Sequence, residues 1–192
     1  MPLSEPVKRR HLHSRTVVME GFAREDGLWD IEGRMTDAKT YGFPNKDRGR
    51  VEAGEPVHDM RVRLTIDVDF RIHHVEASTD ASPYRVCPQI APSYGKLKGA
   101  VIGPGWRAKI RDAMGGREGC THISELLIAM ATAAYQTLFA ERARRSAETP
   151  PLPAKEGRPS WIDSCYALRE EGEVVRREWP QYARPKDQSG IP

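Results

Sequence analysis

The chain has 192 residues, 30% of them charged, and a formal net charge of +3 at pH 7. This length allows one good-sized domain, or a small domain with extensions, and the mixed charges argue against a nucleic-acid partner. No apolar run approaches the roughly 20 residues that span a bilayer and the N-terminus has no apolar signal core, so we expect a cytoplasmic protein without a membrane partner. Three distant cysteines argue for reduced thiols or metal ligands over a disulfide framework.

The N-terminal part predicts an arm followed by a β-hairpin. Residues 1–14 predict a flexible arm with solvated histidines. Residues 17–22 predict a strand, and Asp26-Gly27 predicts a tight turn in which the glycine takes a positive φ. Alternating residues from 29 to 35 predict the returning strand. The folded part of the chain, expected over residues 15–148, therefore begins with antiparallel β-structure.

A long alternation in the middle of the chain predicts the central strand. Residues 42–56 are rich in Gly, Pro and charge and predict a loop or flap. From Met60 to Phe70 apolar and polar residues alternate, which is typical of a strand with one buried face. His58 has the parity of the apolar face, so its imidazole should point inward at the end of the strand. A second strand is expected over residues 72–77.

The second half of the chain predicts helices. Short helices are expected over residues 93–99 and from Trp106 to Met114, and a long amphipathic helix begins near Cys120. Its inward row consists of Ile123, Leu126, Leu127, Met130, Ala134 and Leu138. Residues 149–160 predict a Pro-rich linker, and 161–192 predict a C-terminal strap or last hairpin. The fold class is therefore α+β, an antiparallel sheet of about four or five strands packed against one long helix and shorter ones.

Four residues at the ends of these elements predict a metal site. They are His58, Cys87, Cys120 and His122. Imidazole and thiolate suit a mononuclear Zn or Fe ion, and a helix N-terminus favours the thiolate form that binds metal. No local CxxC or HxxxH pair is present, so the prediction depends on these ends converging. Cys165 could add a further thiolate to the site, but we expect it to be a small buried residue.

Nearby charged residues suggest what such a site could do. Asp59 could be a ligand, could orient a ligating histidine, or could move protons together with Glu125. Arg61 and Arg63 could receive the carboxylate of a small organic acid, although pairing with acids on neighbouring strands is the simpler interpretation. A metal-dependent hydrolase, decarboxylase or lyase would be compatible with this set.

Two other interpretations remain open. Cys120 could be a nucleophile activated by His122, although two residues apart at a helix start they do not obviously face each other. Alternatively, the four residues could be ordinary half-buried side chains in an accessory or binding protein without metal. A homo-oligomer is compatible with either interpretation, and no particular partner is indicated.

Residues 57–141 resemble the U-type iron–sulfur cluster assembly scaffold family. The resemblance is carried by His58-Asp59-Met60, by Cys87 and by Cys120-Thr121-His122, in the order of that family's Cys-Gly-Asp, its second cysteine and its His-Cys pair. It implies a scaffold-like fold with a site at these positions. Histidine replaces the first cysteine and the His-Cys order is inverted. Loss of a thiolate suits one Zn or Fe ion better than a cluster, and a non-catalytic scaffold-like protein is the alternative.

The whole chain also resembles an uncharacterised bacterial family of proteins of unknown function. This resemblance is carried by four segments, residues 26–33, 57–60, 119–122 and 163–165. It spans nearly the full length of the chain. It implies membership of a family but no activity.

Overall fold

The computed structural model describes residues 3–148, 159 and 162–185. The chain divides into two compact units, unit 1 over residues 1–144 and unit 2 over 145–192, which are described separately. The linker predicted at 149–160 lies, apart from residue 159, outside the described residues. So do residues 161 and 186–192 of the predicted strap.

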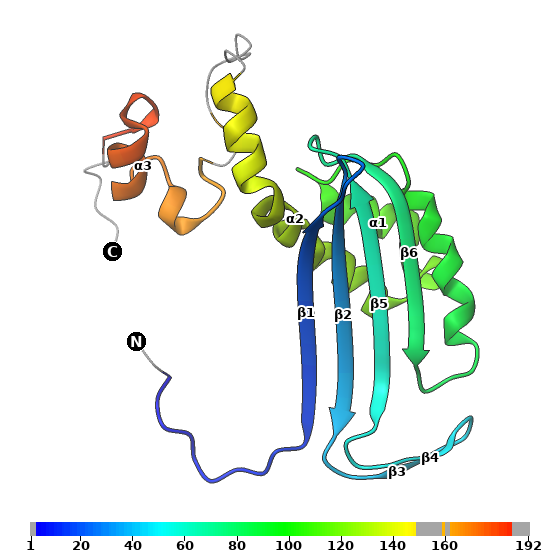
Figure 1. The fold of residues 1–192 in the computed structure, drawn as a ribbon. Coiled ribbons are helices and arrows are strands. Elements are labelled where there is room, and N and C mark those ends of the chain that lie inside the picture. Colours follow the sequence, from blue (N-terminus) through cyan, green and yellow to red (C-terminus); the bar gives the residue numbers. More distant parts are fainter. Residues whose placement is uncertain (1–2, 149–158, 160–161, 186–192) are drawn as a thin grey trace. The chain divides into compact units, whose positions relative to one another are not determined.

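Unit 1 is built on a four-stranded antiparallel sheet with the strand order β1-β2-β5-β6 (Figure 1). Its strands are β1 (His13–Ala23), β2 (Trp29–Lys39), β5 (Pro56–Ile66) and β6 (Ile72–Ala81). A separate two-stranded sheet pairs β3 (Phe43–Asn45) with β4 (Gly49–Val51). The predicted α+β class with its antiparallel sheet is confirmed.

The first hairpin joins β1 and β2. Gly27 takes the positive φ of 81° that its turn requires. The Arg24 N–H donates to the Leu28 carbonyl at 2.9 Å, and the pairing then runs without a register shift along the whole of both strands. Since β1 begins at His13, the predicted arm ends in a strand.

The pairing of β2 with β5 contains a bulge. The register shifts between Asp37 and Ala38, where Asp37 still faces His58 but Ala38 faces Pro56. The segment between the two strands, predicted as a loop, contains the short β3–β4 hairpin. A bulge of this kind bends a strand and increases its twist.

The strand β5 ends at Ile66, four residues before the predicted end at Phe70. The Asp67 carboxylate accepts hydrogen bonds from the N–H groups of Asp69 and Arg71, at 2.9 and 3.0 Å, and so stabilises a turn in place of further strand. Phe70 has a φ of 62° in this turn and is nevertheless buried, with its ring centroid 4.4 Å from that of Tyr135. The alternation of apolar and polar residues therefore continues past Ile66, the last residue of β5, and the predicted strand was too long.

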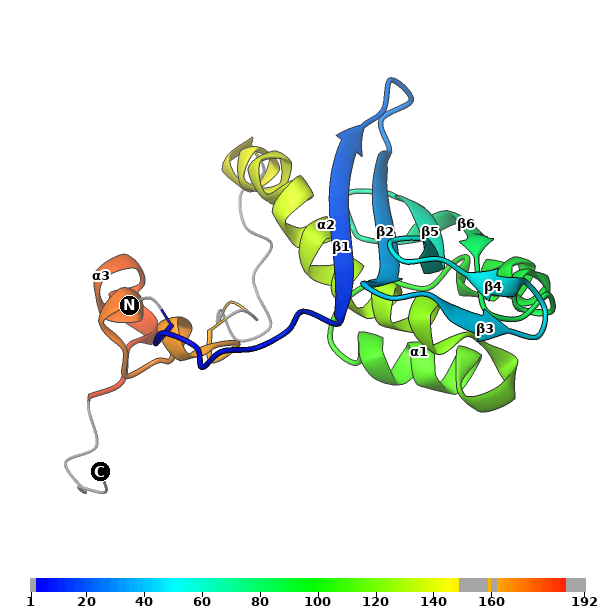
Figure 2. The same ribbon diagram turned by 90° about the horizontal axis from the view of Figure 1, so that it is seen from below.

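Helices cover one face of the sheet (Figure 2). They are η1 (Cys87–Leu97), α1 (Trp106–Met114), η2 (Gly116–Glu118) and α2 (Thr121–Glu148). The six residues of the predicted inward row of α2 are all between 0 and 2% exposed and belong to the core with the inner face of the sheet. The opposite face of the sheet carries polar side chains, as the alternation predicts.

The helix α2 departs from the expectation that the chain has no apolar run long enough to span a membrane. Its residues Thr121–Arg142 are long and apolar enough to cross a membrane by length and composition, which the sequence argument missed, and 33% of that stretch is buried. Core helices of soluble proteins pass the same test, and the inward row of α2 is packed in the core. Cytoplasmic location stays a prediction.

The described part of unit 2 is helical, so the predicted last hairpin is wrong. It contains η3 (Tyr166–Leu168), α3 (Glu173–Glu178) and η4 (Pro180–Tyr182). Gly172 precedes α3, and its carbonyl accepts the N–H of Arg176 at 3.2 Å. Cys165 is exposed, which corrects the expectation of a buried thiol.

Candidate metal site

The imidazole of His58 lies at the bulge in the pairing of β5 with β2. It has the parity of the inward-facing row of β5, as the alternation predicts, and it is opposite Asp37 on β2. His58 Nδ1 lies 3.0 Å from Asp37 Oδ2. Asp37 is only 4% exposed, so this carboxylate is one of the few buried charged groups among the described residues.

The Asp37 carboxylate is saturated with hydrogen bonds. Arg15 donates from Nε to Oδ1 and from Nη2 to Oδ2, both at 2.8 Å, and His13 Nε2 lies 2.9 Å from Oδ1. Together with His58, these donors occupy about four acceptor positions, as many as a carboxylate offers. The bonds from Arg15 above all hold the pKa of Asp37 well below its usual range, against the opposing effect of burial.

These hydrogen bonds determine the tautomer and the charge of the His58 imidazole. Because an ionised carboxylate only accepts, Nδ1 of His58 carries the proton and Nε2 keeps its lone pair. Burial lowers the pKa of His58, and the nearby His122 lowers it further. The imidazole is therefore neutral at neutral pH, which is the form that binds metals.

The other half of the site comes from the start of α2. Cys120 precedes the helix and accepts the N–H of Ser124 at 2.9 Å. The buried Tyr94 hydroxyl donates to the Cys120 carbonyl and accepts the Cys120 N–H, both at 2.8 Å, so the backbone at Cys120 is held on both sides. Cys120 Sγ lies 3.8 Å from His122 Nδ1. The pair therefore does face each other, contrary to the expectation from its spacing.

The two histidines meet between these elements. The ring centroids of His58 and His122 are 4.0 Å apart, with an interplanar angle of 35°. Ligand atoms of Asp37, His58 and His122 all lie within 4.8 Å of one another. Tetrahedral Zn with bonds of about 2.0–2.3 Å places neighbouring ligand atoms about 3.5 Å apart. The limit of 4.8 Å is wider than this spacing, so these side chains would have to move closer together to hold an ion.

A cavity of about 570 Å³ opens beside these side chains. All four predicted ligands line it, since Cys87 joins His58, Cys120 and His122 in its wall. The rest of the wall consists of Met60, Pro83, Tyr84, Val86, Gln89, Ile90, Arg117, Gly119 and Thr121. The convergence of three chain segments is therefore present in the structure, while the closest cluster contains two of the four predicted ligands and Asp37 in place of the cysteines.

The two predicted proton carriers lie in different places. Asp59 points to the opposite face of the sheet, where it accepts from Arg34 at 2.9 and 2.6 Å, and this pair lowers its pKa. Its position corrects the expectation of a carboxylate beside His58, because neighbouring residues of a strand point to opposite faces. Glu125 is exposed on α2 and accepts from Arg15 Nη1 at 3.1 Å, which connects it to the Asp37 network.

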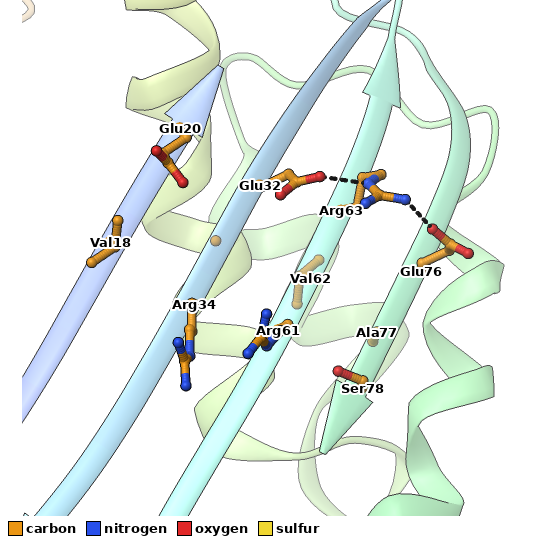
Figure 3. A pocket seen from close by; sticks show the side chains of 11 residues that line it. Val18, Glu20, Glu32, Arg34, Arg61, Val62, Arg63, Glu76, Ala77 and Ser78 are labelled. Atoms are coloured by element: carbon orange, nitrogen blue, oxygen red, sulfur yellow. Dashed lines mark hydrogen bonds and ion pairs between the residues drawn. The ribbon is translucent and has the colours of Figure 1, made fainter. Parts of the chain in front are cut away.

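The predicted substrate-binding arginines are also on the opposite face of the sheet. Figure 3 shows Arg63 between Glu32 and Glu76. Arg63 Nε lies 2.7 Å from Glu32 Oε1, and Arg63 Nη1 lies 2.9 Å from Glu76 Oε2. Arg61 Nε pairs with Asp80 Oδ2 at 2.9 Å. These are the cross-strand pairs of the simpler interpretation. A shallow hollow of about 500 Å³ lies beside Arg61 and Arg63. The sheet separates this hollow from the two histidines, which lie on its other face.

Sequence reasoning missed Asp37 together with its partners Arg15 and His13. One signal was present, because Asp37 continues the inward parity of Ile31, Gly33 and Met35, and a carboxylate on a core-facing row needs a partner. Arg15 lies opposite Asp37 in the register of the first hairpin. Extending that register by a few residues would have identified the pair.

Comparisons with known proteins give a family but no activity. No curated protein and no solved structure matches the chain. The resemblance to iron–sulfur scaffolds therefore finds no support, whereas the expected membership of an uncharacterised family is confirmed. The model of the DUF2889 family matches residues 13–136, which is more than half of the chain, and the protein therefore belongs to this family of proteins of unknown function.

Proposed function

We propose that unit 1 binds one transition-metal ion, Zn or Fe, with His58, His122 and Cys120 as ligands. The observation that carries this is the meeting of two histidine rings 4.0 Å apart with a thiol 3.8 Å from one of them. Nitrogen and sulfur ligands in such a set favour Zn or Fe over Mg or Ca.

Asp37 supports the site without being a ligand in this proposal. Its lone pairs are already used by Arg15, His13 and His58. A carboxylate that accepts from one nitrogen of a histidine orients the ring and raises the basicity of the other nitrogen. Cys87 lines the same cavity and is the natural fourth ligand, and without it one position would stay open to a small molecule.

A catalytic role on a small organic acid extends this proposal. An ion held here would activate a water molecule or polarise a carbonyl oxygen. The cavity beside it supplies largely apolar walls and one charged side chain, Arg117, which is 96% exposed and lies 3.9 Å from Glu118. A carboxylate could pair with that guanidinium. Arg61 and Arg63 are too firmly paired on the other face to serve this cavity.

Metal analysis of matched variants tests the ligand set. Wild type, His122→Ala and Cys120→Ser are compared with His74→Ala and Cys165→Ser, which alter exposed residues outside the site. We expect about one ion per chain in wild type and both controls, and a loss of at least tenfold in metal affinity in both site variants. Co²⁺ loaded into the protein should show a thiolate charge-transfer band that Cys120→Ser removes. Equal metal content in all five proteins, or none in wild type, would refute the proposal.

A second candidate function uses Cys120 as a nucleophile. The 3.8 Å contact with His122 Nδ1 favours it, because a neighbouring imidazole can take the thiol proton. The thiolate would attack an acyl carbon and form a thioester, and the leaving group would take the proton from His122. Water would then hydrolyse the thioester. Iodoacetamide labelling that is faster at Cys120 than at Cys165, is unaffected by chelators and falls in His122→Ala would support this function over metal binding.

A further inference from the structure

The strand β1 is an edge strand with a free side. It pairs with β2 on one side and ends the strand order of the sheet (Figure 1). Within the described residues of unit 1, no strand pairs with its other side. Eleven residues long, β1 is also as long as any strand of the sheet. Its unpaired N–H and C=O groups form a template for another strand.

Two of the usual devices that protect an edge strand, proline and a bulge, are absent from β1. Its central stretch contains no proline, and its pairing has no bulge, in contrast to the other two strand pairs of the sheet. Val17, Val18 and Phe22 are 48, 47 and 45% exposed. Monomeric proteins usually protect edge strands with charges, prolines, bulges or covering segments. The edge of β1 therefore has the character of a pairing surface.

The hairpin determines which backbone groups face outward. Because Arg24 N–H bonds the Leu28 carbonyl, pairs of even-numbered β1 residues are hydrogen-bonded to β2. The contact from Thr40 N–H to the Leu12 carbonyl at the other end gives the same parity. The odd-numbered residues of β1 thus direct their N–H and C=O groups to the free side. An antiparallel second copy of β1 has the same parity and can accept this pattern.

We propose that β1 pairs antiparallel with β1 of a second copy of this chain, about a two-fold axis at Val18. This register uses the full length of both strands, since His13 then faces Ala23 of the other copy. It joins the two four-stranded sheets into one continuous sheet. Two-fold dimers are the commonest form of protein assembly.

The side chains favour this register over its neighbours. On the outer face, Val18 meets its own copy and Glu20 meets Thr16, and Figure 3 shows that Val18 and Glu20 share this face. On the inner face Val17 meets Met19. Moving the axis to Met19 would place Val18 against Glu20, and moving it to Glu20 would oppose two carboxylates, which is unfavourable.

The size of the contact predicts its strength. Eleven residues a side is below the roughly 20–30 of a standard interface. We therefore expect a dimer whose population depends on protein concentration. This inference does not depend on the metal proposal. The pairing uses backbone groups of β1, whereas His13 and Arg15 contact Asp37 through their side chains.

Cysteine cross-linking in the full chain tests the register. In a Cys165→Ser background, Val18→Cys is compared with Glu20→Cys on the same face. The Val18 pair would be non-hydrogen-bonded across the axis, with Cα atoms about 4.5 Å apart, which a disulfide can bridge. We expect mild oxidation to convert Val18→Cys into a reducible dimer at least tenfold faster than Glu20→Cys.

Sedimentation of the unmodified protein completes the test. Wild type should show a monomer–dimer equilibrium, and Val17→Pro, which removes an outward N–H, should shift it to monomer while the circular dichroism spectrum is retained. A monomer at all concentrations, or equal cross-linking of the two cysteine variants, would overturn the proposal.

Discussion

Replacement of Gly21 by alanine should destabilise unit 1 through a single close approach between β1 and α2. A Cβ atom at Gly21 would lie 2.7 Å from Thr137 Cβ, and closer still to Oγ1 and Cγ2 of that residue. Rotation of the threonine cannot relieve this overlap because its own Cβ takes part. Thr137 Oγ1 also donates to the Ala133 carbonyl at 2.8 Å, which holds its rotamer.

The expected cost follows from two opposing effects. Overpacking of a well-filled contact costs about 1–3 kcal/mol, and the depth of this overlap places it near the upper end. Replacing glycine in a strand returns roughly 0.5–1 kcal/mol. The net destabilisation of Gly21→Ala should therefore be about 2 kcal/mol, or a fall in Tm of about 4–8 °C for a chain of this size.

Urea unfolding of wild type, both single variants and the double variant Gly21→Ala/Thr137→Ala measures this contact. Thr137→Ala removes the two nearest atoms, so Gly21→Ala should cost at least 1 kcal/mol less in that background. Gly27→Ala is a contrasting control, because it strains a positive φ without any nearby atom. Additive effects of the two substitutions would mean that β1 and α2 do not pack as described.

Two further predictions concern the turn after β5 and the support of the site. Hydrogen bonds from His73 and from backbone N–H groups lower the pKa of Asp67 although burial acts to raise it. Its contribution to stability is therefore present above the unfolded pKa of about 3.9 and is lost as pH falls through the lower folded value, so Asp67→Asn should lose less stability than wild type between pH 5 and 2 in urea unfolding. Tyr94→Phe leaves the Cys120 N–H unpaired and removes a contact to Ser124, which should cost about 1–3 kcal/mol in the same assay, whereas equal stability would contradict this account.

The sequence is most informative where a period is long. The inward row of α2 and the alternation of β5 were both predictable, because each buried position follows from its neighbours three, four or two residues away. The same periodicity placed His58 at the inner end of a strand and Cys120 at a helix start. The proximity of the candidate ligands could therefore be anticipated from local patterns alone.

Features that depend on pairing were not predictable in the same way. Asp37 acquires its role from Arg15, 22 residues away in sequence, and from His58, 21 residues away, through the registers of two strand pairs. The end of β5 depends on a side chain that bonds to its own backbone, and such local bonds compete with a strand without changing the alternation. The exposure of Cys165 depends on the packing of a short helical unit that its sequence pattern does not reveal.

The bulge after Asp37 separates a part of the chain whose length the candidate site restricts from a part whose length it does not restrict. Between Trp29 and Asp37 an inserted or deleted residue would rotate the carboxylate to the other face of the sheet and remove it from His58. Beyond the bulge, residues 38–55 can change in length, because the irregular pairing absorbs an extra residue. We therefore expect the β3–β4 hairpin to accept a change in length, or a grafted loop, without a change in the geometry of the histidine pair.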